Sequence, residues 1–137
     1  MNFKYAAIFA VTVFAAPAFA EGDAGKGEKT FKKCKSCHMI QNGDDTIVKG
    51  GKTGPNLYGI IGTAAGAQEG FKYGKSLVEA GEKGLVWDAE NLVAYSADPK
   101  AFLKEYLDDG AAKSKMSFKL KKGGEDVAAY LASVLAE

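Results

Sequence analysis

Apolar residues recur at helical spacing in separate segments of the chain, and the clearest segment lies near the carboxyl end. There, after two glycines, the apolar residues that share one side of a helix are Val127, Ala128, Tyr130, Leu131, Val134 and Leu135. The same reading predicts shorter helices at residues 75–80, 88–97 and 99–107, the last with Asp98 as cap and Pro99 in its first turn. The pattern therefore predicts an all-α chain with about four to five helices.

The amino-terminal part of the pattern contains one further helix and a long irregular stretch. Asp23 is the predicted cap of a helix from about Ala24 to His38, with Phe31 facing inward. Residues 41–68 are rich in glycine and polar residues and include Gly54-Pro55, which predicts an extended loop. A loop of this length has to pack on something other than itself.

The first residues have the composition of an export signal. Lys4 precedes an apolar run, and Ala18-Phe19-Ala20 has the small-x-small pattern of a signal-peptidase site. A transmembrane anchor is the alternative, but the uncharged run from Tyr5 to Ala20 spans 16 residues, fewer than the roughly 20 that a bilayer core requires. We expect residues 1–20 to be a cleaved signal peptide, residues 21–137 to form a single domain, and the mature protein to reside in the periplasm.

Charge is distributed unevenly along a chain that is nearly neutral overall. All 18 basic residues are lysines, and the formal net charge is +1. Residues 26–52 carry seven Lys and three acidic residues, residues 113–122 carry five Lys and no acidic residue, and residues 53–112 carry five Lys and nine acidic residues. This asymmetry predicts a dipole that orients encounters with charged partners. The lack of Arg and the near-zero net charge argue against a nucleic-acid partner.

Cys34, Cys37 and His38 form a Cys-x-x-Cys-His motif, which has the spacing of covalent c-type haem attachment. On a helix the three residues share one face, so that the cysteines can bond the haem vinyl groups while the imidazole binds iron. The alternatives are a redox disulfide, half a zinc site, or two buried small residues. No strand precedes the motif as in thioredoxin, and the chain has no further Cys or His for zinc. Haem is therefore favoured.

The residue that fills the second axial position of the iron decides between electron transfer and ligand chemistry. Beyond residue 20 the only methionines are Met39 and Met116. Met39 adjoins the proximal His38 and cannot reach the opposite face, whereas Met116 lies in a polar segment that is unlike a core strand. Met116 is thus the candidate ligand. The alternative is a five-coordinate haem enzyme or gas sensor of peroxidase-like type.

Taken together, these residues resemble the class I cytochromes c, most closely the bacterial cytochromes c2, over essentially the whole chain after residue 20. The matching positions are Gly27, Phe31, Cys34 to His38, Lys52 to Gly59, Gly70 to Tyr73, Trp87, Tyr95, Asp98, Pro99, Met116, Val127, Tyr130 and Leu131. The resemblance implies a cytochrome c fold, in which helices and long loops wrap around one haem c attached through Cys34 and Cys37.

The resemblance also implies roles for individual residues. His38 and Met116 would be the two iron ligands, and the Pro55 carbonyl would accept the proton on the other ring nitrogen of His38. Tyr73 and Trp87 would bond a haem propionate, since each carries a donor on an apolar body.

Three positions depart from the family pattern. Thr63 follows Gly62 where the family has an Arg near the propionates, and this chain contains no Arg. Ser96 replaces an aliphatic residue and Ser114 replaces a Thr. We expect Ser96 to bring a hydroxyl or water near the haem and to lower the reduction potential slightly.

We therefore expect a soluble periplasmic one-electron carrier that cycles haem iron between Fe(II) and Fe(III), and not an enzyme. The resemblance implies a cytochrome bc1 complex as donor and a photosynthetic reaction centre or terminal cytochrome oxidase as acceptor. The protein is expected to be a monomer without a membrane span, docking through lysines around the haem edge. These lysines, the lysine rim, are Lys32, Lys35, Lys52, Lys113, Lys115 and Lys119.

Overall fold

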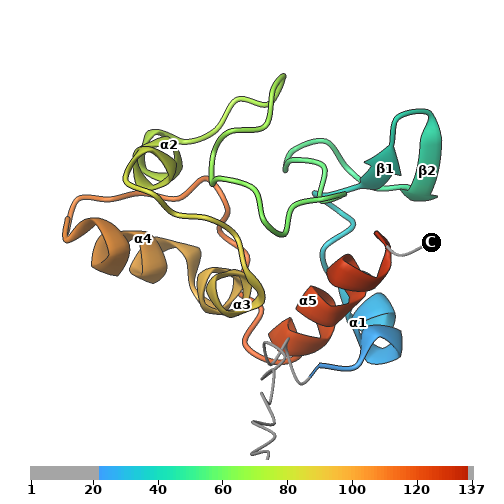
Figure 1. Ribbon diagram of the computed structural model, residues 1–137. Helices are drawn as coiled ribbons and strands as arrows, with labels where there is room; N and C mark the ends of the chain where they lie inside the picture. Colours follow the sequence, from blue (N-terminus) through green and yellow to red (C-terminus); the bar gives the residue numbers. More distant parts are fainter. Residues whose placement is uncertain (1–21, 136–137) are drawn as a thin grey trace, which may run out of the picture.

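The computed structural model describes residues 22–135, in which five α-helices and one two-stranded hairpin are joined by long loops (Figure 1). In chain order the elements are α1 Ala24–Phe31, β1 Ile40–Asn42, β2 Asp45–Val48, α2 Lys75–Glu82, α3 Ala89–Ala97, α4 Pro99–Leu107 and α5 Gly124–Ser133. The predicted all-α class is confirmed, because the only strands of the described residues form one short hairpin. The predicted signal peptide lies outside the described residues.

The terminal helices α1 and α5 lie side by side although they come from opposite ends of the chain (Figure 1). Gly27 makes this approach possible, since a Cβ at this position would overlap the carbonyl oxygen of Asp126 and lie 2.7 Å from the Cβ of Tyr130. One turn later the Phe31 ring packs against the Tyr130 ring with centroids 5.8 Å apart. The two helices therefore meet through backbone at one point and through aromatic rings at the next.

Three aspartates begin helices as the sequence predicted. The side chain of Asp23 accepts a hydrogen bond from the Lys26 backbone N–H at 2.9 Å, and Asp88 accepts from that of Asn91 at 2.7 Å. Asp98 separates α3 from α4 and accepts from the Ala101 N–H at 3.1 Å. Each carboxylate satisfies an N–H that has no partner within its helix.

The first helix is shorter than the pattern predicted. It ends at Phe31, and the backbone N–H groups of Lys33 and Cys34 donate to carbonyls three residues back instead of four, at 3.0 and 2.8 Å. These bonds tighten the chain into successive turns that lead to His38. The predicted continuation of the helix to His38 is therefore wrong. Polar residues follow Phe31, so no apolar stripe extends the helix across the motif.

The predicted loop over residues 41–68 contains a hairpin that the pattern did not reveal. Strand β1 pairs antiparallel with β2, and Asn42 lies opposite Asp45. Gly43 in the turn has a positive φ of 57°, which glycine adopts without strain. An Asn-Gly pair is a strong hairpin signal when apolar residues flank it, so Asn42-Gly43 was the available clue.

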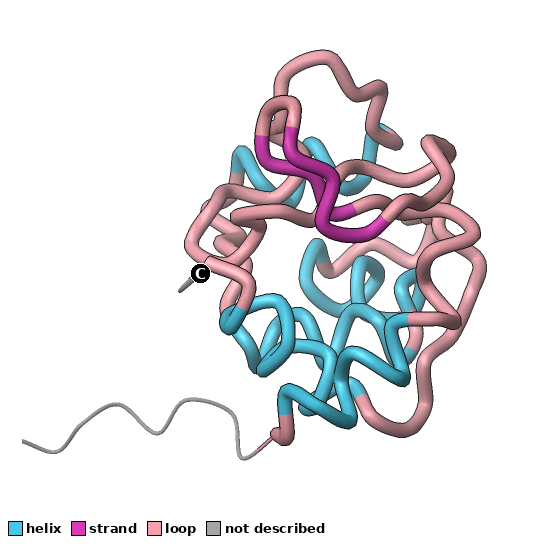
Figure 2. The backbone as a smooth tube through the Cα atoms, turned by 90° about the vertical axis from the view of Figure 1, so that its right-hand side faces the viewer, coloured by secondary structure: helices cyan, strands magenta, loops and turns pink. Residues whose placement is uncertain are grey.

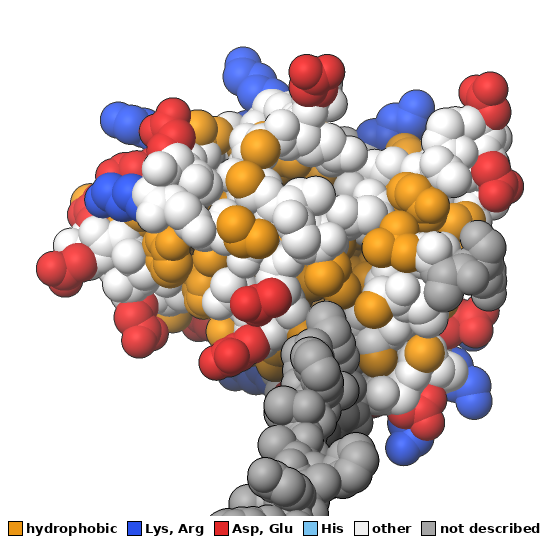
Figure 3. Space-filling model, in the orientation of Figure 1, with side chains coloured by type: hydrophobic (Ala, Val, Ile, Leu, Met, Phe, Trp, Pro, Cys, Tyr) orange, Lys and Arg blue, Asp and Glu red, His pale blue; other side chains and the backbone are white. Residues whose placement is uncertain are grey.

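Most helical segments lie in the lower part of Figure 2, with the hairpin and most loops beside and above them, and further helical segments are drawn behind the hairpin. The buried apolar residues include Phe31 and Leu103 in helices and Ile40 and Leu85 outside them. Apolar side chains also reach the surface across the middle of the face in Figure 3, with charged side chains mainly around its margin. None of the described helices has the length and apolar character needed to cross a membrane.

Candidate functional site

The Cys-x-x-Cys-His motif lies on the turns that follow α1. The backbone N–H groups of Cys37 and His38 both donate to the Cys34 carbonyl, at 3.1 and 3.0 Å, so the local spacing that a helix would give is kept. Both cysteines are free thiols, with Cys34 half-buried and Cys37 exposed. Burial raises the pKa of the Cys34 thiol, and nearby Lys33 opposes this shift. The two thiols and the imidazole thus come from one compact turn.

His38 has a fixed tautomer because one ring nitrogen is already bonded. Its Nδ1 lies 2.8 Å from the Pro55 carbonyl oxygen, which can only accept, so Nδ1 carries the proton and donates. Burial lowers the pKa of His38, and the bond to Pro55 partly opposes this shift. The imidazole is therefore neutral at pH 7, with the lone pair of Nε2 left for a metal.

Three glycines pack directly on the motif. A Cβ on Gly50 or Gly51 would overlap the carbonyl oxygen of His38 or Ser36, and a Cβ on Gly54 would lie 2.7 Å from the Nδ1 of His38. The Gly51 and Gly54 N–H groups donate to the carbonyls of Lys35 and Cys37 at 2.9 and 2.8 Å. At Gly50, Gly51 and Gly54 the backbone thus lies directly against one side of the motif, with no side chain between.

Asn56 ties the segment after Pro55 to the start of the hairpin. Its side-chain oxygen accepts from the Gln41 N–H at 3.0 Å and from the Tyr58 N–H at 3.1 Å, and its side-chain nitrogen donates to the Gln41 carbonyl at 2.7 Å. The Leu57 N–H donates to the Met39 carbonyl at 3.0 Å. The Asn56 side-chain amide thereby fixes the position of the neighbouring Pro55, whose carbonyl orients His38. The sequence reading gave Asn56 no role, although its place after Pro55 was the available signal.

Met116 lies in the irregular segment between α4 and α5. It is half-buried and packs against the buried core, as Cys34 also does. The Ser114 hydroxyl donates to the Met116 carbonyl at 2.9 Å and lies 3.4 Å from the Tyr95 hydroxyl. Burial raises the pKa of Tyr95, and the hydrogen bond with Ser114 opposes this shift. The replacement Ser114 therefore links the Met116 backbone to α3.

Tyr73 and Trp87 differ in how firmly they are held. Trp87 is buried, and its backbone N–H and carbonyl bond to Thr63 and Gly62 at 2.9 and 2.7 Å. Its ring packs edge-on against Tyr95 with centroids 5.0 Å apart. Tyr73 is half-buried, and burial raises its pKa while a hydrogen bond with the Gln68 backbone lowers it. Trp87 is thus held more firmly than Tyr73.

The other two departures from the family pattern have local hydrogen-bond partners. The Thr63 side chain is exposed, and its hydroxyl donates to the Ile60 carbonyl at 2.6 Å. The Ser96 hydroxyl donates to the Val93 carbonyl one turn earlier at 3.2 Å. The expected effect of Ser96 on the potential stays a prediction.

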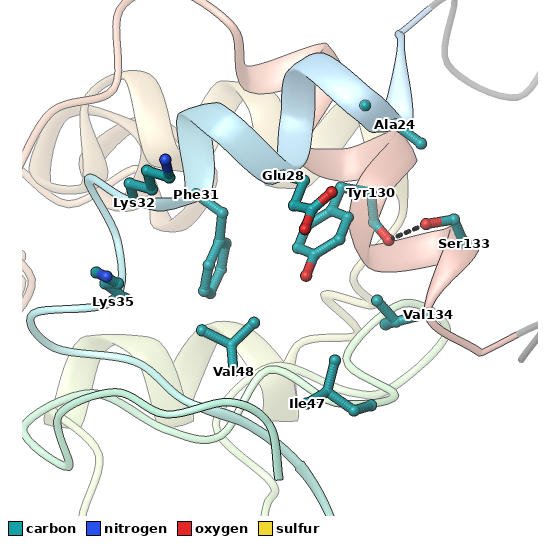
Figure 4. Close-up of a pocket in the computed structure, with 11 residues that line it drawn as sticks. Ala24, Glu28, Phe31, Lys32, Lys35, Ile47, Val48, Tyr130, Ser133 and Val134 are labelled. Carbon is teal, nitrogen blue, oxygen red and sulfur yellow. Dashed lines mark hydrogen bonds between the residues drawn. The ribbon is translucent and has the colours of Figure 1, made fainter.

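All six residues of the lysine rim are exposed, but they are not equivalent. The Lys119 ammonium pairs with Asp98 at 2.8 Å, and the Lys115 ammonium donates to the Lys72 carbonyl at 2.9 Å. Lys32 and Lys35 lie at one end of a cavity of about 410 Å³ between α1, the hairpin and the end of α5 (Figure 4). Phe31 and Val48 face each other across its apolar part in the same view.

Curated proteins resemble this chain over nearly its whole length. No protein-family model matches it. It is 62% identical to cytochrome c-551 of Roseobacter denitrificans over 135 residues, which cover 98% of this chain and 96% of the relative. It is 61% identical to cytochrome c2 of Rhodobacter capsulatus, with 95% of each chain covered.

Solved structures agree with these relatives. The structure of cytochrome c2 from Rhodobacter capsulatus matches with a TM-score of 0.81 and 60% identity, covering 83% of this chain and 99% of that one. The structure of cytochrome c-550 from Paracoccus versutus matches with a TM-score of 0.80 and 55% identity, covering 82% and 98%.

The helical fold and the Cys-x-x-Cys-His turn, together with these matches, define a class I cytochrome c that carries one covalently bound haem c. Within that class, the chain belongs to the cytochrome c2 family. It is an electron-transfer protein and not an enzyme, and the five-coordinate enzyme or gas sensor is not supported.

The residues present fit this cofactor. His38 keeps Nε2 available because Nδ1 is bonded to Pro55, and Gly54 leaves the space beside the ring that a side chain would fill. Both thiols are free to form thioether bonds. In the described residues no three His, Cys, Asp or Glu side chains gather as a metal site, so the zinc alternative gains no support.

Proposed function

We propose that Cys34 and Cys37 carry the thioether bonds and that His38 and Met116 are the axial ligands of the haem iron. The observation that carries this proposal is the 2.8 Å bond between His38 Nδ1 and the Pro55 carbonyl, because it directs Nε2 towards a metal. The resemblance supports Met116 as the second ligand. Tyr73 and Trp87 are proposed as donors to a haem propionate.

When bound, the haem iron supplies the reversible one-electron couple, and the chain controls its preference for the reduced state. The Met116 thioether is a soft, neutral ligand that favours Fe(II). The Pro55 carbonyl fixes the tautomer and the orientation of the imidazole, while burial lowers its pKa and so favours its neutral form. Apolar surroundings disfavour the more highly charged ferric state. With His38 and Met116 both bound to the iron, its reduction would require little rearrangement, which would suit electron transfer better than substrate turnover.

We propose that residues 1–20 are a signal peptide and that the mature protein acts in the periplasm. Residues 18–20 and the apolar run before them support cleavage after Ala20. The solved cytochrome c2 of Rhodobacter capsulatus matches along 99% of its own length but along only 83% of this chain. This difference also supports a mature form shorter than the full 137-residue sequence.

Protein purified from a periplasmic fraction is expected to have the mass of residues 21–137 plus one haem. Intact-mass spectrometry measures this directly. Replacing Ala18 and Ala20 by Leu removes the small residues that the peptidase recognises, and the uncleaved mass is expected. Recovery of the full 137-residue chain from the wild-type gene would contradict cleavage.

We propose a cytochrome bc1 complex as electron donor and a photosynthetic reaction centre or terminal oxidase as acceptor, docking through the lysine rim. The exposure of all six lysines supports this assignment. Lys35, directly after Cys34, and Lys32, two residues before it, are the strongest candidates because they are the rim lysines nearest the thiols in sequence. Opposite charges on a partner would accelerate encounter and make it dependent on salt.

The bimolecular rate of electron transfer from a bc1 complex is expected to fall as ionic strength rises. At low salt, Lys35→Gln is expected to slow the reaction and flatten its salt dependence. Lys83→Gln is the matched control, because this exposed lysine lies outside the rim and pairs with Glu79 at 3.3 Å. Stopped-flow spectroscopy measures both rates. Equal effects of the two variants, or rates that do not depend on salt, would exclude the proposed docking surface.

A further inference from the structure

The corner between α3 and α4 contains a carboxylate with two separate tasks. Asp98 follows the last residue of α3 and precedes Pro99, the first residue of α4. One carboxylate oxygen caps α4 by accepting from the Ala101 N–H at 3.1 Å. The other oxygen accepts from the Lys119 ammonium at 2.8 Å. Asp98 thus connects the helix corner to the segment that carries Met116.

The same corner holds this segment at two further points, one on each side of Met116. Two residues before Met116, the Ser114 hydroxyl lies 3.4 Å from the Tyr95 hydroxyl of α3. Four residues after it, the Leu120 N–H donates to the Ser96 carbonyl at 2.7 Å. Residues 114–120 therefore make three contacts with residues 95–98. One contact lies before Met116 in the sequence and two lie after it.

Met116 packs against the core on one side and borders an open space beside α4 on another. A cavity of about 360 Å³ is lined by Met116, Ser117 and Lys119 on the side of the segment and by the first turn of α4 on the other. The segment therefore has space into which it can shift. The Lys119–Asp98 contact bridges residues that line this cavity and joins its two sides.

We propose that the Asp98–Lys119 ion pair is a latch that holds Met116 in its position as axial ligand. Asp98 and Lys119 are positioning residues, since neither needs to contact the iron. The proposal rests on the proposed ligation by Met116. It gives Lys119 a role within the molecule in addition to its predicted place in the lysine rim.

The latch is expected to be weak but measurable. The two side chains are 48% and 38% exposed, so water and salt screen their attraction. Exposed ion pairs shift an equilibrium by about 1.4- to 5-fold. We therefore expect the open state, in which Met116 has left the iron, to become about 2- to 5-fold more populated when the latch is removed.

Binding of imidazole to the ferric, haem-loaded protein measures this opening, because imidazole competes with Met116 for the same axial position. Lys119→Gln and Asp98→Asn are each expected to lower the Kd of imidazole about 2- to 5-fold. Asparagine remains a good helix cap, so Asp98→Asn removes the charge while leaving α4 capped. The double variant is expected to match either single variant, because both changes break the same contact.

Two further variants separate the latch from general effects. Lys119→Arg keeps the charge and the donor and is expected to bind imidazole as the wild type does. Lys122→Gln removes a charge from an exposed lysine of the same segment and is expected to leave the Kd unchanged. If Lys119→Gln behaves like Lys122→Gln, or if the effects of Asp98→Asn and Lys119→Gln multiply in the double variant, the latch is wrong.

The far-red absorption band of Met-ligated ferric haem separates failure of the latch from failure of the proposed function. If the wild-type protein lacks this band, the proposed ligation is wrong and the latch is wrong with it. If the band is present and the latch variants bind imidazole as the wild type does, only the latch is wrong.

Discussion

Replacement of Gly27 by Ala is expected to destabilise the folded protein by about 3 kcal/mol, near the upper end of the cost of overpacking. The added methyl group would overlap the Asp126 carbonyl oxygen and lie 2.7 Å from the Cβ of Tyr130. A backbone carbonyl cannot rotate away as a side chain can, so α1 and α5 have to separate. Denaturant unfolding of the haem-loaded protein, followed by circular dichroism, measures the change in free energy of unfolding.

Gly25→Ala is the matched control, because it lies in the same helix two residues earlier. Its Cβ would meet only the end of the Asp23 side chain, at 3.2 Å. Ala is favoured over Gly within a helix by about 1 kcal/mol, so this variant is expected to be as stable as the wild type or slightly more stable. Equal stability of the Gly27 and Gly25 variants would contradict the close helix crossing.

Met116→Leu is expected to abolish the far-red band of the ferric protein and to lower its reduction potential by at least about 60 mV. That difference corresponds to about 1.4 kcal/mol for a one-electron couple. Leucine has a similar volume but no sulfur, so packing is largely kept while the ligand that prefers ferrous iron is lost. Absorption spectroscopy and a redox titration measure the two effects.

Met39→Leu makes the same chemical change beside His38 and serves as the control. Met39 is half-buried, and its backbone carbonyl accepts from the Leu57 N–H at 3.0 Å, a bond that the substitution does not remove. We expect this variant to keep the band and the potential of the wild type. Loss of the band in Met39→Leu, or its survival in Met116→Leu, would overturn the ligand assignment.

The helix caps and the helical class could be predicted because their causes are local. Asp23, Asp88 and Asp98 each bond an N–H three residues ahead, within the stretch of sequence that predicted them. The local pattern also predicted that the first helix continues to His38, but turns replace the helix after Phe31. The polar residues after Phe31 give the helix no apolar stripe to continue, and residues 50–54 pack on the turns that replace it, a contact that no local pattern contains.

The sequence predicted the chemistry of the candidate site but not the contacts that hold its residues in place. The motif and the resemblance placed His38 and Pro55 together, and the structure brings them to 2.8 Å. The contacts of Asn56 with Gln41 and of Lys119 with Asp98 join residues 15 and 21 positions apart. Such contacts depend on the complete fold, so residue types and spacing alone did not reveal them.

The glycines at positions 50 and 51 have a genetic consequence. Each faces a main-chain carbonyl of the motif, at His38 and Ser36. A clash between two side chains can be relieved by a second mutation that makes the neighbour smaller. Every amino acid has the same main-chain carbonyl, so no substitution at residue 36 or 38 can remove the obstacle. A search for suppressors of Gly50→Ala or Gly51→Ala is therefore expected to return true revertants and no compensating change at the residue contacted.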